Sequence, residues 1–231
     1  MKTIHLTSIG STQDFLRQNF AQLSREDDKI LITTEKQTAG IGRGANSWDT
    51  FENSIAFSFT MNGNPRLTLS SLEVGLLISL WLEDELSVET RLKWPNDLLT
   101  YDLKKCGGIL IHSASGNNLI VGVGLNFNPI DDEESLLRGK NYQVPATFLR
   151  KALPKDFKKS LPGKCFDYIL KHRLPPERVI QLWTERCAHI NQLVRIEESA
   201  DVVEGFFEGI GLDGEALING KRVYSGTLRI C

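Results

Sequence analysis

The sequence predicts an α+β protein, in which a mixed or antiparallel sheet is flanked by helices and followed by a small β domain. Up to about residue 188, segments with the two-residue period of strands are interspersed with segments of helical periodicity. Two of the strand-like segments, 106–113 and 118–127, are separated by a short polar turn and predict a β-hairpin. Beyond residue 188 the helical periodicity is lost, and short strand-like segments alternate with glycines. We therefore expect a first domain at 1–188 and a compact β-barrel at 189–231, too small to be stable without docking on the first.

The composition is that of an ordinary globular protein. Charged residues make up 24% of the 231 residues and apolar ones 41%, and the net charge of −2 gives no support to a general role on nucleic acids or membrane surfaces. The four cysteines form no CxxC pair and the four histidines are scattered, so neither a zinc site nor a disulfide framework is expected. The N-terminus has no apolar signal core and no segment has the length of a membrane span. We expect a cytoplasmic protein.

The first elements are a strand, a capped helix and a buried strand. Residues 3–9 read as a short strand that ends at Gly10. Ser11 is suited to cap a helix that runs to about Leu23, with Asp14 completing a partial capping box. Taken alone, Ser11 and Thr12 are therefore capping residues. Residues 29–34 (KILITT) predict a buried strand.

The segment Gln37–Trp48 combines three glycines with one arginine. Glycines allow backbone N–H groups to converge on an anion, and the guanidinium of Arg43 is suited to phosphate or carboxylate. The segment has neither the Walker spacing nor the Rossmann fingerprint. It is a candidate anion-binding loop, and the alternative is a mobile surface loop.

A strand, a turn and the longest helix of the chain follow. Residues 54–61 alternate apolar and polar side chains, which is the period of a half-buried strand. Residues 62–65 form a turn, and the apolar residues of 69–86 recur at intervals of three and four. We expect this helix to belong to the core.

The segment Arg91–Leu110 carries polar groups next to a predicted strand end. Lys93, Asn96 and Asp97 surround Trp94-Pro95, and the residue before a proline is driven to extended geometry, so Trp94 should lie on or just past a strand end. Lys105 then precedes two glycines and an apolar run. The pattern indicates a site, and the alternative is an ordinary turn with solvated charges.

The later segments complete the first domain. Residues 117–128 (NNLIVGVGLNFN) have two glycines inside a strand, which usually marks the close approach of a ligand or another backbone. Helices are predicted at 145–153, at 156–174 with an interruption at Pro162-Gly163, and from Pro175-Pro176 onward.

Three of these segments resemble the signatures of biotin protein ligases, in the family's order and spacing. Gly40–Trp48 is similar to GRGRxGRxW or GRGRGGNxW, Lys93–Asp97 with Lys105–Leu110 to KWPND followed by KxxGIL, and Gly122–Asn126 to GxGxN. The family's STN helix start is matched by Ser11-Thr12-Gln13. The resemblance implies a catalytic domain like those of biotin ligases and class II aminoacyl-tRNA synthetases, with an SH3-like C-terminal barrel. No helix-turn-helix segment precedes the match, so we expect a monofunctional ligase without a DNA-binding domain and without a repressor role.

The resemblance also implies a two-step reaction. The carboxylate of biotin attacks the α-phosphate of ATP, with Mg²⁺, and the biotinyl-5′-AMP formed then acylates one lysine of a biotin carboxyl carrier domain. Two anions must be brought together, which needs fixed cations and backbone N–H groups, and water must be kept from the intermediate. The oligomeric state, monomer or homodimer, stays open.

Site residues follow from the matched positions. Arg43 would hold the adenylate phosphate, Lys105 the biotin carboxylate and α-phosphate, and Lys93 further phosphate charge. Trp48 would pack against the adenine. The resemblance assigns catalysis to Arg43, Lys93 and Lys105; biotin binding to Ser11, Thr12, Gln13, Gln37, Gly40, Ile41, Gly42, Arg43, Lys105 and Gly108; nucleotide binding to Arg43, Trp48, Lys93, Asn96, Asp97, Lys105 and Asn126; and Mg²⁺ to Asp97.

The sequence departs from the family pattern at Ile41, where the usual loop has its first arginine. If that arginine supplies charge, the affinity for biotin or the adenylate would be lower here. If only its backbone N–H faces the ligand, isoleucine would be neutral or would help to cover an apolar ring. We favour the second interpretation, because Arg43 is retained. Two alternative functions are a lipoate- or octanoate-transferring ligase of the same superfamily, whose members lack KWPND, and a non-catalytic module that binds biotin or its carrier. Retention of Arg43, Lys93, Asp97 and Lys105 argues against the module.

Overall fold

The computed structural model describes residues 1–44, 46–129, 146–149, 151, 153–198 and 201–231. A seven-stranded central sheet has the order β1-β2-β5-β9-β8-β7-β6. β1 and β2 are parallel and the other neighbours are antiparallel, so the sheet is mixed, as predicted. Its strands are β1 (Lys2–Leu6), β2 (Ile30–Thr34), β5 (Asn53–Asn62), β6 (Arg91–Lys93), β7 (Asp97–Leu99), β8 (Lys105–Ser113) and β9 (Asn118–Asn128).

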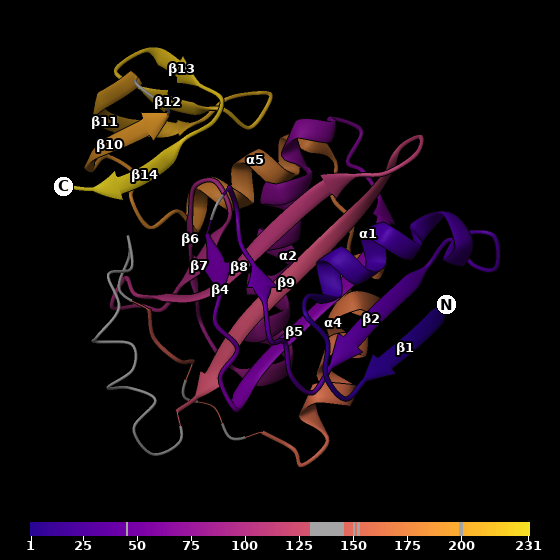
Figure 1. Ribbon diagram of the computed structural model, residues 1–231. Coiled ribbons are helices and arrows are strands. Elements are labelled where there is room, and N and C mark those ends of the chain that lie inside the picture. The colour runs from indigo at the N-terminus through magenta and orange to yellow at the C-terminus, as the bar shows by residue number, and fades with distance from the viewer. Residues whose placement is uncertain (45, 130–145, 150, 152, 199–200) are drawn as a thin grey trace.

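Helices cover both faces of this sheet (Figure 1). α1 (Thr12–Leu23) packs on one face, while α2 (Ser70–Leu86) and α4 (Phe157–Lys171) pack on the other. The alternation within β2 follows from this arrangement: Ile30 and Ile32 belong to the cluster under α1, and Leu31 belongs to the larger core with α2 and α4. The remaining helices of the described ranges are η1 (Leu67–Leu69) and α5 (Pro176–Glu185). No helix in the described ranges is both long enough and apolar enough to cross a membrane.

The C-terminal residues form a separate five-stranded antiparallel sheet, here called the C-terminal sheet, with the order β13-β12-β11-β10-β14 (Figure 1). Its strands are β10 (Leu193–Glu198), β11 (Asp201–Ile210), β12 (Ala216–Ile218), β13 (Lys221–Val223) and β14 (Thr227–Ile230). The predicted docking is present: the ring of His189 lies between Trp183 of α5 and Phe207 of β11, and the core continues into this sheet. The indole N–H of Trp94 also donates to the Gly214 carbonyl at 2.9 Å.

Most predicted elements are confirmed, including the Ser11 cap, whose hydroxyl accepts from the Asp14 amide at 3.3 Å. The helix predicted at 145–153 is wrong for its described residues. The Thr147 amide bonds to the Lys105 carbonyl and the Leu149 amide to the Asn126 carbonyl, so this stretch lies along the ends of β8 and β9.

The helix predicted at 156–174 is not interrupted, because α4 continues through Pro162. Proline removes one hydrogen bond from a helix interior. The turns around it are held by tertiary packing, since Leu161, Cys165 and Phe166 are buried in the core against α2 and β5.

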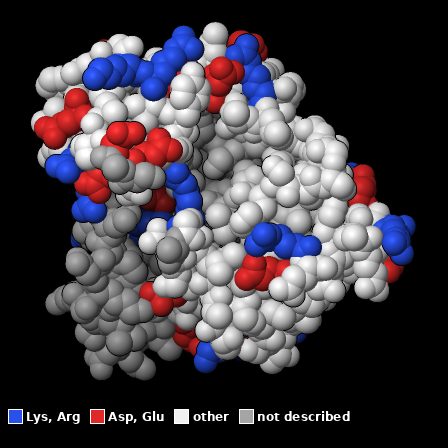
Figure 2. Space-filling model, turned by 45° about the horizontal axis from the view of Figure 1, so that its top comes forward, with Lys and Arg blue, Asp and Glu red and all other residues white. Residues whose placement is uncertain are grey.

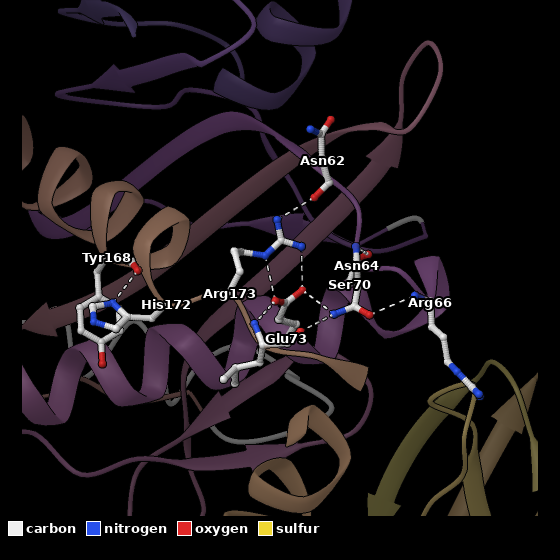
Figure 3. Close-up of polar contacts among 9 residues, drawn as sticks. Asn62, Asn64, Arg66, Ser70, Glu73, Tyr168, His172 and Arg173 are labelled. Carbon is white, nitrogen blue, oxygen red and sulfur yellow. Dashed lines mark hydrogen bonds and ion pairs between the residues drawn. The ribbon is translucent and has the colours of Figure 1, made fainter. Parts of the chain in front are cut away.

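A buried carboxylate ties α2 to the segment between α4 and α5 (Figure 3). Glu73 is fully buried, and Arg173 binds both of its oxygens, at 2.8 and 2.9 Å. The Leu174 amide and the Asn64 side-chain amide donate to the same carboxylate at 2.9 Å each. A buried charge is tolerated when it is paired and fully hydrogen-bonded, as here. The network fixes the helical layer behind the central sheet.

Candidate functional site

A pocket with a volume of about 790 Å³ lies on the α1 face of the central sheet, at its border with the C-terminal sheet. Its walls are the start of α1, the loop from Gln37 to Asp49, the turn between β6 and β7, and residues 197–198 and 225–228 of the C-terminal sheet. The space-filling view shows a recess in the surface with acidic and basic side chains beside it (Figure 2).

The floor of the pocket is made of strand residues without side chains. Gly108 of β8 is the register partner of Gly124 of β9, and Gly122 lies two residues away on the same face. The Trp48 ring rests on this floor, because a Cβ on Gly124 would lie 2.3 Å from Trp48 Cε2. The indole Nε1 of Trp48 is buried and has no hydrogen-bond partner among the described residues. The glycines thus create space for a flat group against the backbone.

One carboxylate joins two lysines beside this floor. Asp97 Oδ1 lies 2.5 Å from Lys105 Nζ, and Asp97 Oδ2 lies 3.2 Å from Lys93 Nζ. Burial opposes ionisation of Asp97, but the two ammonium groups outweigh it and lower the pKa of the carboxyl group. Burial lowers the pKa of Lys93, and Asp97 opposes this shift. Both lysines are therefore held by a single carboxylate, with their positive charge next to the floor.

Arg43 brings a third cation to the same place. Its charge contributes to the lowered pKa of Lys93, and Arg43 Nη1 donates to the carbonyl of Gly226 in the C-terminal sheet at 2.9 Å. Three cations from a loop and two strands therefore converge on one pocket. Like charges repel, and a bound anion would relieve this repulsion. The arrangement suits a ligand with two or more negative groups.

The other end of the pocket is polar and uncharged. The Thr12 amide and hydroxyl both donate to Gln37 Oε1, at 2.8 and 3.1 Å, and the Thr12 hydroxyl lies 2.9 Å from that of Ser58. Ser11, the cap of α1, is 5% exposed and lines the pocket as well. Ser11 and Thr12 thus begin a helix and face the pocket together. Hydroxyl and amide groups of this kind suit a polar, uncharged group of a ligand.

Thirteen of the predicted site residues line this pocket: Ser11, Thr12, Gln13, Gln37, Ile41, Gly42, Arg43, Trp48, Lys93, Asn96, Asp97, Lys105 and Gly108. Gly40 and Asn126 are not in the lining. Gly40 pairs with Trp48 where β3 (Gly40–Ile41) meets β4 (Ser47–Trp48). Asn126 is buried on β9, and its Oδ1 finds no hydrogen-bond partner within the described ranges.

Sequence reasoning missed two contributors to the pocket. Ser58 lies on the polar face of β5, which the alternation predicted to be solvated, but α1 and the pocket cover that face and the residue is fully buried. The run Ser225–Leu228 of the C-terminal sheet was also missed. It carries no charged side chain, and Gly226 contributes through its backbone carbonyl, so no signal in the sequence marked it.

A resident Mg²⁺ does not fit the described residues. Within the described ranges, no group of three or more His, Cys, Asp or Glu side chains is placed to hold a metal ion. Both oxygens of Asp97 already accept from ammonium groups. Mg²⁺ usually keeps few protein ligands and binds through substrate phosphates. The assignment of Asp97 to Mg²⁺ stays a prediction.

The fold and pocket define an α+β protein whose pocket, between a glycine floor and a cluster of cations, suits a small anionic molecule. A sequence model of the biotin/lipoate A/B protein ligase family matches residues 6–128, more than half of the chain. The chain belongs to this family, which confirms the resemblance found in the motifs.

Individual relatives agree with this placement. The chain is 32% identical over 129 residues to the chloroplastic biotin–protein ligase 1 of Arabidopsis thaliana, and 32% identical over 114 residues to the bifunctional ligase/repressor BirA of Bacillus spizizenii. These matches cover 51% and 45% of this chain and 34% of each relative, so the chain matches about a third of the length of these relatives. Among solved structures, a biotin protein ligase from Aquifex aeolicus in complex with biotin and ATP has a TM-score of 0.76 at 25% identity, and the match covers 100% of this chain and 99% of that one.

Proposed function

We propose that the protein is a biotin protein ligase, which activates biotin with ATP to biotinyl-5′-AMP and transfers the biotinyl group to a lysine of a biotin carboxyl carrier domain. The observation that carries the proposal is the convergence of Arg43, Lys93 and Lys105 at one glycine-floored pocket. The first step brings the biotin carboxylate up to a triphosphate, and fixed cations offset that repulsion without reorganising during the reaction.

The pocket offers a place for each part of the intermediate. The polar end with Ser11, Thr12 and Gln37 suits the ureido ring of biotin, and the cations suit the carboxyl and phosphate groups. Trp48 rests on the glycine floor, where its ring is available to pack against the adenine. Ile41 lines the pocket and adds apolar cover in place of the family's usual arginine.

We expect Lys93 and Lys105 to change their ion-pair partner when the nucleotide binds. Lys93 and Lys105 are paired with Asp97, and the phosphates of the nucleotide would compete with this carboxylate for them. Mg²⁺ would arrive on the phosphates of ATP, and Asp97 would be free to contact it only after Lys93 and Lys105 have left its two oxygens. The location proposed for the protein is the cytoplasm, because Cys106, Cys165, Cys187 and Cys231 are all free thiols.

The proposal is tested with labelled biotin, Mg-ATP and a biotin carboxyl carrier domain. The expected result is release of pyrophosphate that depends on biotin, together with label on the carrier. Label from lipoate or octanoate in place of biotin would assign the protein to the other branch of the family. Pyrophosphate release without labelled carrier would contradict the transfer step, and binding of biotin without pyrophosphate release would contradict catalysis.

A further inference from the structure

Gln13 presents an unused acceptor to the pocket. The side chain is 3% exposed, and its Oε1 is buried with no hydrogen-bond partner among the residues that the structure describes. A Cβ on Gly122 would lie 2.7 Å from this oxygen, so the oxygen points at the glycine floor. An orphan acceptor inside a pocket costs free energy until a donor reaches it. A ligand that supplies an N–H or O–H group at this point would satisfy the acceptor.

The nitrogen of the same amide, Gln13 Nε2, already has hydrogen-bond acceptors for both of its hydrogens. Gln13 Nε2 lies 3.0 Å from the Ile120 carbonyl oxygen, 3.0 Å from His112 Nδ1 and 3.4 Å from the Leu110 carbonyl oxygen. An amide nitrogen has two hydrogens, and here each faces an acceptor. The contact requires a neutral His112 that carries its proton on Nε2, because Nδ1 must accept. Reversing the amide would place its oxygen against the Ile120 carbonyl and the Nδ1 lone pair, so His112 and Ile120 together fix its direction.

We infer that His112 is a positioning residue for ligand binding, because it accepts from Gln13 Nε2 and so keeps Gln13 Oε1 turned into the pocket to accept an N–H of a ureido ring. The inference rests on the proposed function, since the ureido ring is that of biotin. His112 is not itself among the residues that line the pocket. It acts through Gln13, and the match to the family motifs gave no reason to single it out.

The positioning depends on the charge of His112. The charged groups that face it belong to α1: Arg17 and Asp14, which form an ion pair at 3.2 Å. On the sheet side its register partner is Ile120, which is uncharged. Burial lowers the pKa of His112 from its ordinary 6.5, Arg17 lowers it further, and Asp14 opposes both. The imidazole is therefore neutral at neutral pH. When it becomes protonated, Nδ1 turns from acceptor to donor, and the direction of the Gln13 amide is no longer fixed.

Two substitutions separate the role of His112 as a hydrogen-bond acceptor from the effect of its protonation. In His112→Asn, Oδ1 takes the place of Nδ1 as an acceptor that does not titrate, whereas His112→Leu offers no acceptor. His172→Asn is the matched control, because His172 bonds to the Tyr168 carbonyl at the end of α4 and lies outside the pocket lining. Calorimetric titration with biotin alone, without ATP, measures binding separately from catalysis.

The expected dissociation constant for biotin rises about tenfold in His112→Leu and is rescued in His112→Asn at neutral pH. For the wild type and His172→Asn it rises as the pH falls through the pKa of His112, and for His112→Asn this rise is absent. Identical pH profiles for wild type and His112→Asn, or wild-type affinity of His112→Leu, would overturn the inference.

A second readout needs no ligand. In ¹⁵N NMR spectra of the free protein, the side-chain amide signals of Gln13 should shift with the titration of His112 in the wild type and stay constant in His112→Asn. Gln13 signals that ignore the titration of His112 would overturn the positioning role. If the wild type binds no biotin at any pH, the proposed function and the ureido assignment fail, while the NMR titration still decides whether His112 positions Gln13.

Discussion

The guanidinium of Arg43 donates to the carbonyl oxygen of Gly226, 183 residues further along the chain, at 2.9 Å. This bond connects the Gln37–Trp48 loop to the C-terminal sheet, and both residues line the pocket. The same guanidinium is the group proposed to hold the adenylate phosphate. Arg43 is therefore kept at the pocket by a neutral acceptor, and a phosphate, which forms stronger charge-assisted bonds, would compete for it.

Arg43→Ala should weaken retention of the adenylate by about tenfold or more, because a charged hydrogen bond to the phosphate is lost. The released mixed anhydride would then label lysines on bystander proteins. Labelling of serum albumin added beside the carrier domain measures this effect.

Arg66→Ala is the matched control for that variant. Arg66 Nη1 also donates to a carbonyl of the C-terminal region, that of Leu212 at 3.0 Å, but Arg66 does not line the pocket. Albumin should become labelled with the Arg43→Ala variant and not with the Arg66→Ala variant. If both variants label it equally, the effect comes from docking of the C-terminal sheet, and the role given to Arg43 is wrong.

Lys105→Ala should reduce biotin-dependent pyrophosphate release by about a hundredfold, since a fixed cation at the reacting anions is removed. Lys104→Ala is the neighbouring control, because Lys104 pairs with Asp102 at the surface, 2.8 Å away. Circular dichroism should be unchanged in both. Normal pyrophosphate release by Lys105→Ala would remove Lys105 from the site.

Asp97→Asn should lower the free energy of unfolding by about 3 kcal/mol at neutral pH, because Lys93 and Lys105 lose the carboxylate that joins them. The pKa of Asp97 is lowered from its ordinary 3.8. Its contribution is therefore present above that value and is lost as the pH falls through the folded-state pKa. Urea unfolding at a series of pH values should show the difference from wild type shrinking in acid. A difference that is constant with pH would contradict the ionised pair.

Gly124→Ala should displace Trp48 from the glycine floor, because the new Cβ would lie 2.3 Å from the ring. The expected outcome is a changed Trp48 fluorescence spectrum and weakened binding of both ligands, with the fold intact. Gly163→Ala, in the interior of α4, is the control, since a Cβ there meets nothing within 4 Å. It should leave the binding unchanged and stabilise the helix by about 0.5–1 kcal/mol. Unchanged fluorescence in Gly124→Ala would place Trp48 elsewhere.

Trp94→Phe tests the docking of the C-terminal sheet. The substitution removes the bond from the indole N–H to the Gly214 carbonyl and leaves a smaller ring at a site that is 1% exposed. A loss of about 1–3 kcal/mol is expected, seen as a melting temperature lower by several degrees in scanning calorimetry. An unchanged melting temperature would show that this contact contributes nothing to docking.

Features that depend on neighbours in the chain were predictable from the sequence. The Ser11 cap, the strand β5 and the hairpin of β8 and β9 all follow from residues a few positions apart, although β5 is buried on both faces and not on one as its alternation predicted. Features that depend on distant partners were not. The amides of Thr147 and Leu149 bond to the ends of β8 and β9 instead of forming a helix.

The residues of the site also fall into those that could be predicted from the sequence and those that could not. The residue pattern marked Arg43, Lys93 and Lys105 as candidates, and the resemblance to a family assigned them to one site. Ser58 and Gly226 were not predicted, because Ser58 is placed by α1 packing over β5 and Gly226 acts through a backbone carbonyl that any residue type would carry. The role of His112 could not be predicted either, because its contact with Gln13 joins residues 99 positions apart.

The central claim is that Arg43, Lys93 and Lys105 hold two anions together, and a crystal structure of the complex with biotinyl-5′-AMP tests it most directly. The account predicts that the guanidinium and both ammonium groups lie within about 4 Å of the phosphate or acyl oxygens, with the ureido ring beside Thr12 and Gln37. A phosphate bound away from these three side chains would contradict it.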